Sequence, residues 1–324
     1  EKLYWQQTAT VRFGDEYSEF FPTKMGVRQG CVLSPKLFNL YTEKIFNESD
    51  ELPGCVVGGE NLNNLRYADD TALLAESESA LQDIVDVVRQ NSEEKGLSMN
   101  VKKTKTMVVC RDETPDVRIA INGQVLEQVK KFKYLGQWIT DDGRCECEIK
   151  NRIEIARSTF IKMRDVLISR KLHLEIRKRL VRCYVLSTFL YASESWTLDR
   201  QIEDKINAFE MWIFRRMFRI SHLDRKTNVE VLEMAKAKQT LLRTIQERKL
   251  QYFGHLIRGK GKQKLLMEGK IEGTRRKGKQ RRTWTSDVTG WCGSSYTKCV
   301  RMAENRKEWS SMTADLLIRR WHPQ

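Results

Sequence analysis

Two adjacent aspartates, Asp69 and Asp70, stand between two apolar segments and constrain the fold more than any other feature. Residues 62–74 have the pattern of a strand, a tight turn and a second strand, so we expect both acids at the tip of a β-hairpin. Carboxylate oxygens suit Mg²⁺ or Mn²⁺, and paired metals about 4 Å apart stabilise both oxygens of an in-line phosphoryl displacement. The turn therefore predicts a metal site for nucleotidyl transfer, with a solvated turn as the alternative.

A glycine-containing run, GVRQGCVLSP at residues 26–35, precedes this turn, and Gly30 lies 37 residues before Tyr67. The two runs resemble motifs B and C of reverse transcriptases carried by non-LTR (LINE-like) retrotransposons. Ala68, between Tyr67 and the acids, is similar to the non-LTR and group II intron branch. The resemblance implies that Asp69 and Asp70 hold Mg²⁺ or Mn²⁺, with Asp70 the weaker ligand. It also implies that three residues contact template and nucleotide: Arg28, Gln29 and Gly30.

Further runs extend the resemblance. Residues 96–105 (GLSMNVKKTK) look like motif D, which implies that Lys103 meets the incoming triphosphate and protonates the leaving pyrophosphate. Residues 132–136 (FKYLG) resemble the hairpin that grips the primer 3′ end, which implicates Tyr134, Leu135 and Gly136. A solvated lysine loop and an ordinary core strand are the respective alternatives.

The second half of the chain has helical periodicity, as in Ile149, Ile153, Ala156 and Phe160. Its YASESW run at residues 191–196 looks like a family Y-G-x-E-x-W motif, with an alanine in place of the usual glycine. Its YFGHL run at 252–256 looks like a W-x-G-H segment. The predicted role of three aromatic or imidazole side chains there is packing, namely Trp196, Trp212 and His255.

The resemblance implies an α+β fold: a partial right-hand polymerase palm (an antiparallel sheet with helices), an all-α thumb and a C-terminal helical extension. We expect the palm over residues 1–142, the helical thumb over 143–258, and a basic loop with C-terminal helices over 259–324. The local patterns predict a hairpin over 8–23, a helix N-cap at Ser34, a capping box of Ser79 with Gln82, a buried strand over 106–110, a type I′ turn at Asn122-Gly123, a strand over 132–139, and two helices over 284–321.

Positive charge is concentrated near the C-terminal end. The net charge is +15, and residues 258–282 hold eleven Lys and Arg against two Glu. Such a segment favours a polyanion such as nucleic acid. We expect a mobile loop that binds nucleic acid, with a nuclear-localisation signal or a solvated loop as alternatives. The binding residues predicted are Arg275, Arg276, Lys277, Lys279, Arg281 and Arg282.

No apolar run approaches the roughly 20 residues that span a bilayer, and no signal peptide is visible. The eight cysteines lack paired metal-ligand spacing and indicate reduced thiols. Cys292, Cys299 and His322 do not match a C-x2-C zinc site. We therefore expect no membrane partner, an intracellular location in cytoplasm or nucleus, and no zinc; the oligomeric state is not predicted.

The family's metal site needs a further aspartate in motif A, F-x-D-x-x-x-A-F-D, which the 324 residues do not match. Phe13-Gly14-Asp15 mimics it, but Asp15 beside glycine favours a hairpin turn. The function expected is an RNA-directed DNA polymerase that uses an RNA template, a DNA primer and dNTPs, with this chain inactive alone. A non-catalytic nucleic-acid-binding remnant and a group II intron maturase-like protein are the alternatives.

Overall fold

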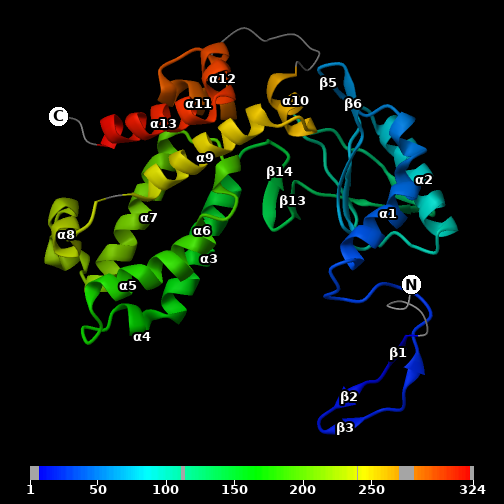
Figure 1. Ribbon diagram of the computed structural model, residues 1–324, viewed down its shortest axis with the longest axis horizontal. Coiled ribbons are helices and arrows are strands. Elements are labelled where there is room, and N and C mark those ends of the chain that lie inside the picture. Colours follow the sequence, from blue (N-terminus) through cyan, green and yellow to red (C-terminus); the bar gives the residue numbers. More distant parts are fainter. Residues whose placement is uncertain (1–6, 111–113, 239, 270–280, 322–324) are drawn as a thin grey trace. The chain divides into compact units, whose positions relative to one another are not determined.

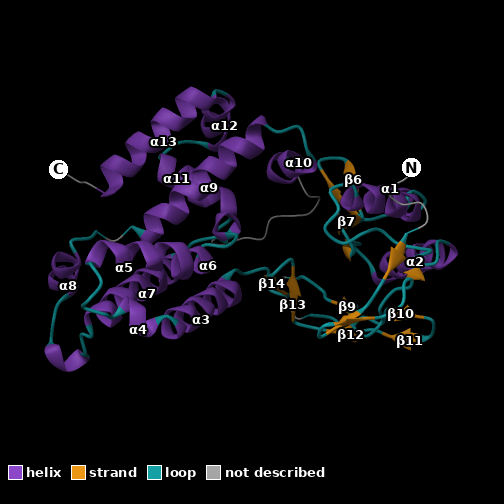
Figure 2. Ribbon diagram, turned by 60° about the horizontal axis from the view of Figure 1, so that its bottom comes forward, coloured by secondary structure: helices purple, strands orange, loops and turns teal. Residues whose placement is uncertain are grey.

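The computed structural model describes residues 7–110, 114–238, 240–269 and 281–321, with side chains described as far as residue 315. It mixes helices with short, two-stranded sheets (Figures 1 and 2). The chain divides into two compact units. The first comprises residues 1–56, 60–106 and 116–128, and the second comprises residues 57–59, 107–115 and 129–324. The predicted domain limits at 142 and 258 stay predictions. The hairpin of β13 (Lys131–Tyr134) and β14 (Gln137–Thr140) belongs to the second unit, whereas the predicted limit at 142 lies after it.

The first unit begins with the hairpin predicted over residues 8–23, which is confirmed. Strand β1 (Thr8–Ala9) pairs with β4 (Phe21–Pro22), and β2 (Arg12–Phe13) pairs with β3 (Glu16–Tyr17). Gly14, at φ +62°, turns the chain between β2 and β3. Asp15 lies in that turn and faces Arg12 at 3.4 Å, as a turn residue would.

A helix capped by Ser34 would begin at Pro35, but α1 (Ser34–Phe46) already includes Ser34. The assignment of Ser34 as N-cap was therefore wrong. Leu33 is the cap residue, and Pro35 stands in the first turn. The Ser34 hydroxyl donates to the carbonyl of Arg28 instead of accepting from a helix amide. This hydrogen bond joins the first residue of α1 to the loop before it, and so it sets where the helix starts.

Helix α2 (Glu78–Glu94) is capped by Ser77, whose hydroxyl accepts from the Ala80 N–H at 3.2 Å. The predicted capping box of Ser79 with Gln82 was wrong. The Gln82 amide bonds the backbone N–H and carbonyl of Ala120 instead, at 2.8 and 2.9 Å. The apolar face of α2, which includes Ile84, Val85 and Val88, belongs to two small clusters with Ile45, Phe46, Ile119, Ile121 and Leu126.

Three short hairpins also form in this region. Two lie between α1 and α2, namely β5 (Cys55–Val57) with β6 (Glu60–Leu62) and β7 (Asn64–Tyr67) with β8 (Asp70–Leu73), and the third, after α2, is β10 (Ala120–Ile121) with β11 (Gln124–Val125). Asn122 and Gly123 both have positive φ, which confirms the type I′ turn. The strand predicted over 106–110 was wrong. Only β9 (Lys105–Thr106) forms, because its parallel partner β12 (Glu127–Gln128) is itself two residues long.

The segment predicted as one strand over 132–139 is a hairpin of β13 (Lys131–Tyr134) and β14 (Gln137–Thr140). Leu135 and Gly136, at φ +48° and +80°, reverse the chain. A leucine rarely adopts this conformation, which is why the turn was not recognised as such.

Helices form most of the second unit (Figure 1). They are α3 (Glu146–Lys162), α4 (Arg164–Leu167), α5 (Leu174–Leu180), the π-helical turn η2 (Val181–Leu186), α6 (Ser187–Phe189), the 3₁₀ turn η3 (Ser193–Ser195), α7 (Arg200–Phe218), α8 (Asn228–Ala235), α9 (Leu241–Arg258), α10 (Lys262–Glu268), α11 (Trp284–Cys292), α12 (Tyr296–Glu304) and α13 (Arg306–Trp321). Three helices therefore stand where two were predicted, and α10 lies in the expected loop. One apolar core unites them and includes Phe160, Phe189, Phe209 and Phe253.

Candidate functional site

The acidic turn is a hairpin tip, as predicted. Ala68 and Asp69 form the turn between β7 and β8, and Asp70 opens β8 opposite Tyr67. Ala68 adopts φ +54°, a left-handed conformation. Both carboxylates are exposed, and the Tyr67 side chain is 67% exposed beside them. The turn thus presents two acids to solvent, where nothing in the first unit neutralises them by an ion pair among the described residues.

These carboxylates are oxygen donors of the kind that Mg²⁺ and Mn²⁺ prefer. In the described parts of the chain, no group of three or more His, Cys, Asp or Glu side chains could hold a metal. By their chemistry, the Asp69 and Asp70 carboxylates fit as two ligands of such an ion. Their role as metal ligands stays a prediction.

The run before α1 depends on two glycines. Gly26 and Gly30 adopt φ +97° and +82°, and no atom lies within 4 Å of where a Cβ would stand. Glycine is therefore needed here for its dihedral freedom, and the space above it is open. Arg28 and Gln29 are exposed. The Arg28 carbonyl accepts the Cys31 N–H at 3.3 Å, which tightens the turn.

Lys103 lies in the turn that follows α2. The Asn100 side-chain oxygen accepts its backbone N–H at 3.1 Å, an Asx turn that fixes the loop. The Lys103 side chain is exposed, as is that of Lys102. Lys105 differs, because its ammonium is 2.7 Å from Glu127. Of the three lysines in this run, Lys102 and Lys103 therefore offer a charge to a ligand.

The β13–β14 hairpin lies in the second unit and is held by α3. Arg152 donates to the Gly136 carbonyl at 2.5 Å, and Glu148 accepts the Trp138 N–H at 2.8 Å. Arg152 and Glu148 also pair with each other, with side chains only 9% and 3% exposed. This anchoring pair was missed from sequence, although two opposite charges at i and i+4 within an apolar stripe were a usable signal.

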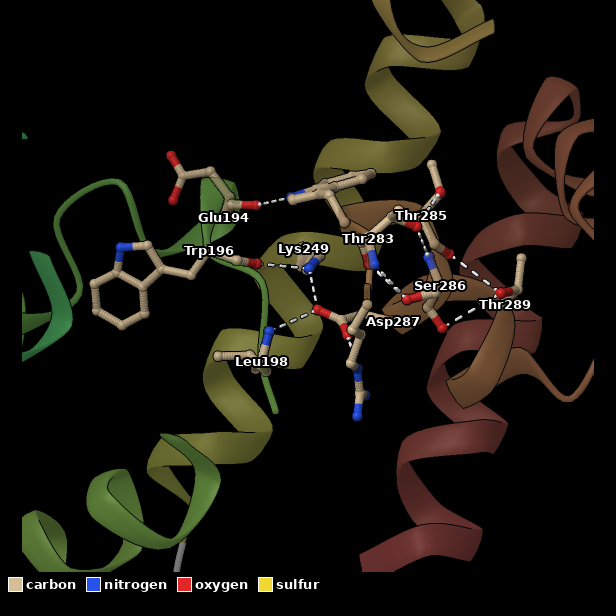
Figure 3. A network of polar contacts seen from close by, with 11 residues as sticks. Glu194, Trp196, Leu198, Lys249, Thr283, Thr285, Ser286, Asp287 and Thr289 are labelled. Atoms are coloured by element: carbon tan, nitrogen blue, oxygen red, sulfur yellow. Dashed lines mark hydrogen bonds and ion pairs between the residues drawn. The ribbon is translucent and has the colours of Figure 1, made fainter. Parts of the chain in front are cut away.

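The YASESW run contacts residues of α9 and α11 (Figure 3). The buried Lys249 ammonium donates to the Trp196 carbonyl at 2.6 Å and pairs with Asp287, which accepts the Leu198 N–H at 2.9 Å. Trp284 donates to the Glu194 carbonyl at 2.8 Å. Burial lowers the pKa of Lys249 to about 8, against the opposing effect of Asp287. Lys249 and Trp284 thus hold the run at two of its carbonyls.

The packing role predicted for Trp196 is confirmed, since its ring is 1% exposed and meets Phe189 edge-on at 5.3 Å. Trp212 also packs, at 5.2 Å from Phe160. His255 is exposed, so its packing role was wrong. Its neighbour Gly254 lies close to another side chain, because a Cβ there would stand 2.6 Å from the Trp309 ring.

Of the six cations predicted in the basic segment, Arg275, Arg276, Lys277 and Lys279 lie outside the described residues. Arg281 donates to the Asp142 carbonyl at 2.7 Å, and Arg282 donates to Asp287 at 2.6 Å. These two arginines therefore anchor the end of the segment to the second unit. They are weaker candidates for phosphate contacts than the sequence indicated.

Two further features bear on partners. Burial raises the pKa of the Cys292 thiol to about 12, which favours the neutral thiol over a metal-binding thiolate; His322 lies outside the described residues. Among the helices that are described, none has both the length and the apolar character required to cross a bilayer.

Comparisons with known proteins show what the chain is similar to. Residues 1–139 match the family described as reverse transcriptase (RNA-dependent DNA polymerase). A transposon-derived protein of Caenorhabditis elegans is 28% identical over 78% of this chain and 95% of its own length.

Two larger relatives bear polymerase names. The Pol polyprotein of the type-1 retrotransposable element R2 of Nasonia vitripennis is 29% identical over 41% of this chain and 14% of its own length. The RNA-directed DNA polymerase of mobile element jockey of Drosophila funebris is 25% identical over 59% and 22%. The chain thus spans less than a quarter of either. The chain is therefore similar to the reverse transcriptases of non-LTR retrotransposons. The match of residues 1–139 indicates the family, and the names of the relatives indicate the type of element.

Proposed function

We propose that this chain is part of an RNA-directed DNA polymerase of a non-LTR retrotransposon. The observation that carries the proposal is the pair of exposed acids on the β7–β8 turn, inside the region that matches the reverse transcriptase family. In the proposed reaction, a primer 3′-hydroxyl attacks the α-phosphate of a deoxynucleoside triphosphate, and an RNA template selects the base.

Each site element has a task in this proposal. Asp69 and Asp70 hold the divalent cations, which supply charge stabilisation to the attacking and leaving oxygens. The open backbone at Gln29 and Gly30 lies against template and nascent base pair. Lys103 gives a proton to the leaving pyrophosphate, and the Leu135-Gly136 turn holds the primer end. Mg²⁺ or Mn²⁺, RNA template, DNA primer and dNTP are the implied ligands.

The proposal includes a requirement for another carboxylate. Two acids on one turn leave a two-metal site underbound and the transferring phosphoryl poorly compensated. We therefore expect no primer extension by the 324-residue chain alone. Extension that is lost in Asp15→Ala would show that Asp15 is the missing ligand and that our assignment of it to a turn role is incomplete.

Primer extension on an RNA template with Mg²⁺ or Mn²⁺ tests the function, using the chain fused to a segment that carries motif A. Asp69→Asn should abolish extension, and Asp70→Asn should reduce it. Asp83→Asn, an exposed acid of α2, is the matched control and should leave extension unchanged. Equal loss in all three variants would contradict the assignment.

A non-catalytic nucleic-acid-binding remnant is the second candidate, favoured by the eleven cations of residues 258–282. The genomic sequence upstream of Glu1 separates the two, since an open frame with motif A supports the enzyme and stop codons support the remnant. Binding by this segment is tested with Arg275, Arg276, Lys277 and Lys279 changed to Ala. Arg281 and Arg282 are kept, because both hold the second unit together. An unchanged salt dependence would exclude the segment.

A further inference from the structure

A second concentration of positive charge lies at one end of the helical unit. Residues 162–182 contain eight Lys and Arg against two acids, and residues 215–226 contain five against one. Together with residues 258–282, these segments carry more than the whole net charge of +15, so the rest of the chain is net acidic. We call the surface of residues 162–182 and 215–226 the basic end.

The fold brings these two segments together. The buried guanidinium of Arg177 in α5 donates to the carbonyls of Leu167 and Met217, at 3.4 and 3.2 Å, and so joins the C-terminal ends of α4 and α7. The Lys178 ammonium reaches the Lys236 carbonyl after α8 at 3.1 Å. Figures 1 and 2 show α4, α5 and α8 at the same end of the helical unit.

The helical geometry points the cations outward. Val181, Val185 and Phe189 are buried at steps of four residues. The wider π-helical turn of η2 keeps such steps on one face. Arg179 and Arg182 therefore lie on the exposed side of the same helix.

Little of this charge is neutralised within the protein. Among the described residues, ion pairs at the basic end involve Lys178 with Glu175 and Lys226 with Glu230. No ion pair with a described carboxylate is formed by the remaining exposed cations, which are Lys162, Arg164, Arg170, Lys171, Arg179, Arg182, Arg216, Arg219 and Arg225. Clustered, unpaired like charges repel one another, and a polyanionic ligand would relieve that repulsion.

We propose that the basic end binds the phosphate backbone of nucleic acid, as a contact surface additional to residues 258–282. Arginine, which predominates there, suits phosphate because its planar fork donates two hydrogen bonds at once. Contacts of this kind position a nucleic acid without reading its sequence. The proposal does not depend on catalysis at Asp69 and Asp70.

This surface is separate from the β13–β14 hairpin. Helix α3 contacts the hairpin through Glu148 and Arg152, near its N-terminal end, and ends at Lys162, beside α4. Its 17 residues span about 25 Å. Substitutions at the basic end therefore leave the hairpin contacts intact, and a bound duplex that reaches both would extend over several base pairs.

The test compares two variants of the full chain that remove the same charge. The first changes Arg170, Lys171, Arg179 and Arg182 to Gln; the control changes Lys298, Arg301, Arg306 and Lys307 to Gln, which are exposed cations of α12 and α13 in the same unit. Binding to a 20-nucleotide RNA and to an RNA–DNA duplex is measured by fluorescence anisotropy between 50 and 300 mM salt. Circular dichroism establishes that both variants fold.

The slope of log K against log salt should fall in the first variant by roughly 0.7 to 0.9 for each phosphate group that the protein no longer neutralises, and affinity at the lowest salt should drop at least tenfold. The control should retain most of its affinity and slope. Equal losses in both variants would overturn the proposal, since they would reflect net charge alone. Unchanged nucleic-acid binding with lost binding to phosphatidylserine vesicles would also overturn it. Either result leaves the primer-extension test of the proposed function untouched.

Discussion

The Tyr191 hydroxyl donates a 3.0 Å hydrogen bond to the carbonyl of Leu135, in the left-handed turn of the β13–β14 hairpin. The Tyr191 ring lies against Gly136 and stacks with the Arg152 guanidinium at 4.5 Å. Arg152 bonds the next carbonyl, that of Gly136. The YASESW run is therefore tied to the hairpin at one end and to Lys249 at the other, which couples two sequence motifs 56 residues apart.

Tyr191→Phe should loosen this hairpin while keeping the ring contacts. One half-exposed hydrogen bond contributes at the low end of about 0.5–1.5 kcal/mol, so we expect amide exchange in β13 and β14 to quicken several-fold with little change in global stability. Hydrogen exchange with mass spectrometry measures this. Tyr184→Phe, at a tyrosine 53% exposed, is the control. Identical exchange in both variants would show that the bond does not restrain the turn.

Ala192→Gly should stabilise the second unit. Ala192 adopts φ +54° and ψ 24°, which costs an L-residue roughly 1–2 kcal/mol, partly offset because glycine gains more freedom on unfolding. We expect a net gain of roughly 0.5–1 kcal/mol. Urea unfolding followed by tryptophan fluorescence reports on this unit, since seven of the eight tryptophans follow residue 129. Ala156→Gly, inside α3, is the control and should destabilise the second unit. A loss of stability in both variants would show that the backbone of Ala192 is not strained.

Gly254→Ala should destabilise the same unit, because the added Cβ would stand 2.6 Å from the Trp309 ring. Trp309 is buried and donates to the Leu250 carbonyl at 2.8 Å, so it has little freedom to move. Overpacking of this kind costs about 1–3 kcal/mol. Gly290→Ala in α11, where no atom lies within 4 Å of the new Cβ, is the control and should be neutral or mildly stabilising. Equal effects in the two variants would argue against a close approach.

Features that depend on neighbouring residues could be predicted from the sequence, whereas features that depend on contacts between distant residues could not. The Asp69 turn and the Asn122-Gly123 turn follow from a few neighbouring residues, and both are confirmed. The assignment of the α2 cap failed because Gln82 bonds Ala120, a partner 38 residues away. The β13–β14 turn was missed because Leu135 adopts a glycine-like conformation. The basic end was missed because its charges come from two segments that are distant in sequence and are brought together by tertiary contacts, such as the bond from Arg177 to Met217.

Lys249→Met should destabilise the second unit strongly. Among the residues that the structure describes, it leaves Arg282 and the Leu198 N–H as partners of Asp287, whose side chain is 0% exposed. Removing one member of a buried pair costs about 3–5 kcal/mol. Adding Asp287→Asn removes the uncompensated charge and should recover part of the loss. Urea midpoints of both single variants and the double variant form the cycle, and strictly additive effects would show that the two groups are not coupled.

Glu210→Gln should remove a pH dependence of stability. Glu210 accepts the N–H groups of Thr240 and Leu241, at 2.9 and 3.2 Å, and caps α9, whose own cap residue, Thr240, makes no side-chain capping bond. Burial raises the pKa of this carboxyl above 4.5 despite these bonds. Between 4.5 and the raised value the folded state binds more protons than the unfolded state, so stability falls as pH rises through that window.

The glutamine keeps an oxygen acceptor and carries no charge, so the variant should equal or exceed the wild type at pH 7. Its advantage should shrink as the pH falls toward 4.5, where the wild-type carboxyl is protonated in the folded state. Urea midpoints from pH 4.5 to 7.5 measure the difference. Glu233→Gln, an exposed residue of α8, serves as the control. A difference between Glu210→Gln and the wild type that stays constant across this range would mean that Glu210 is ionised in the fold at no cost.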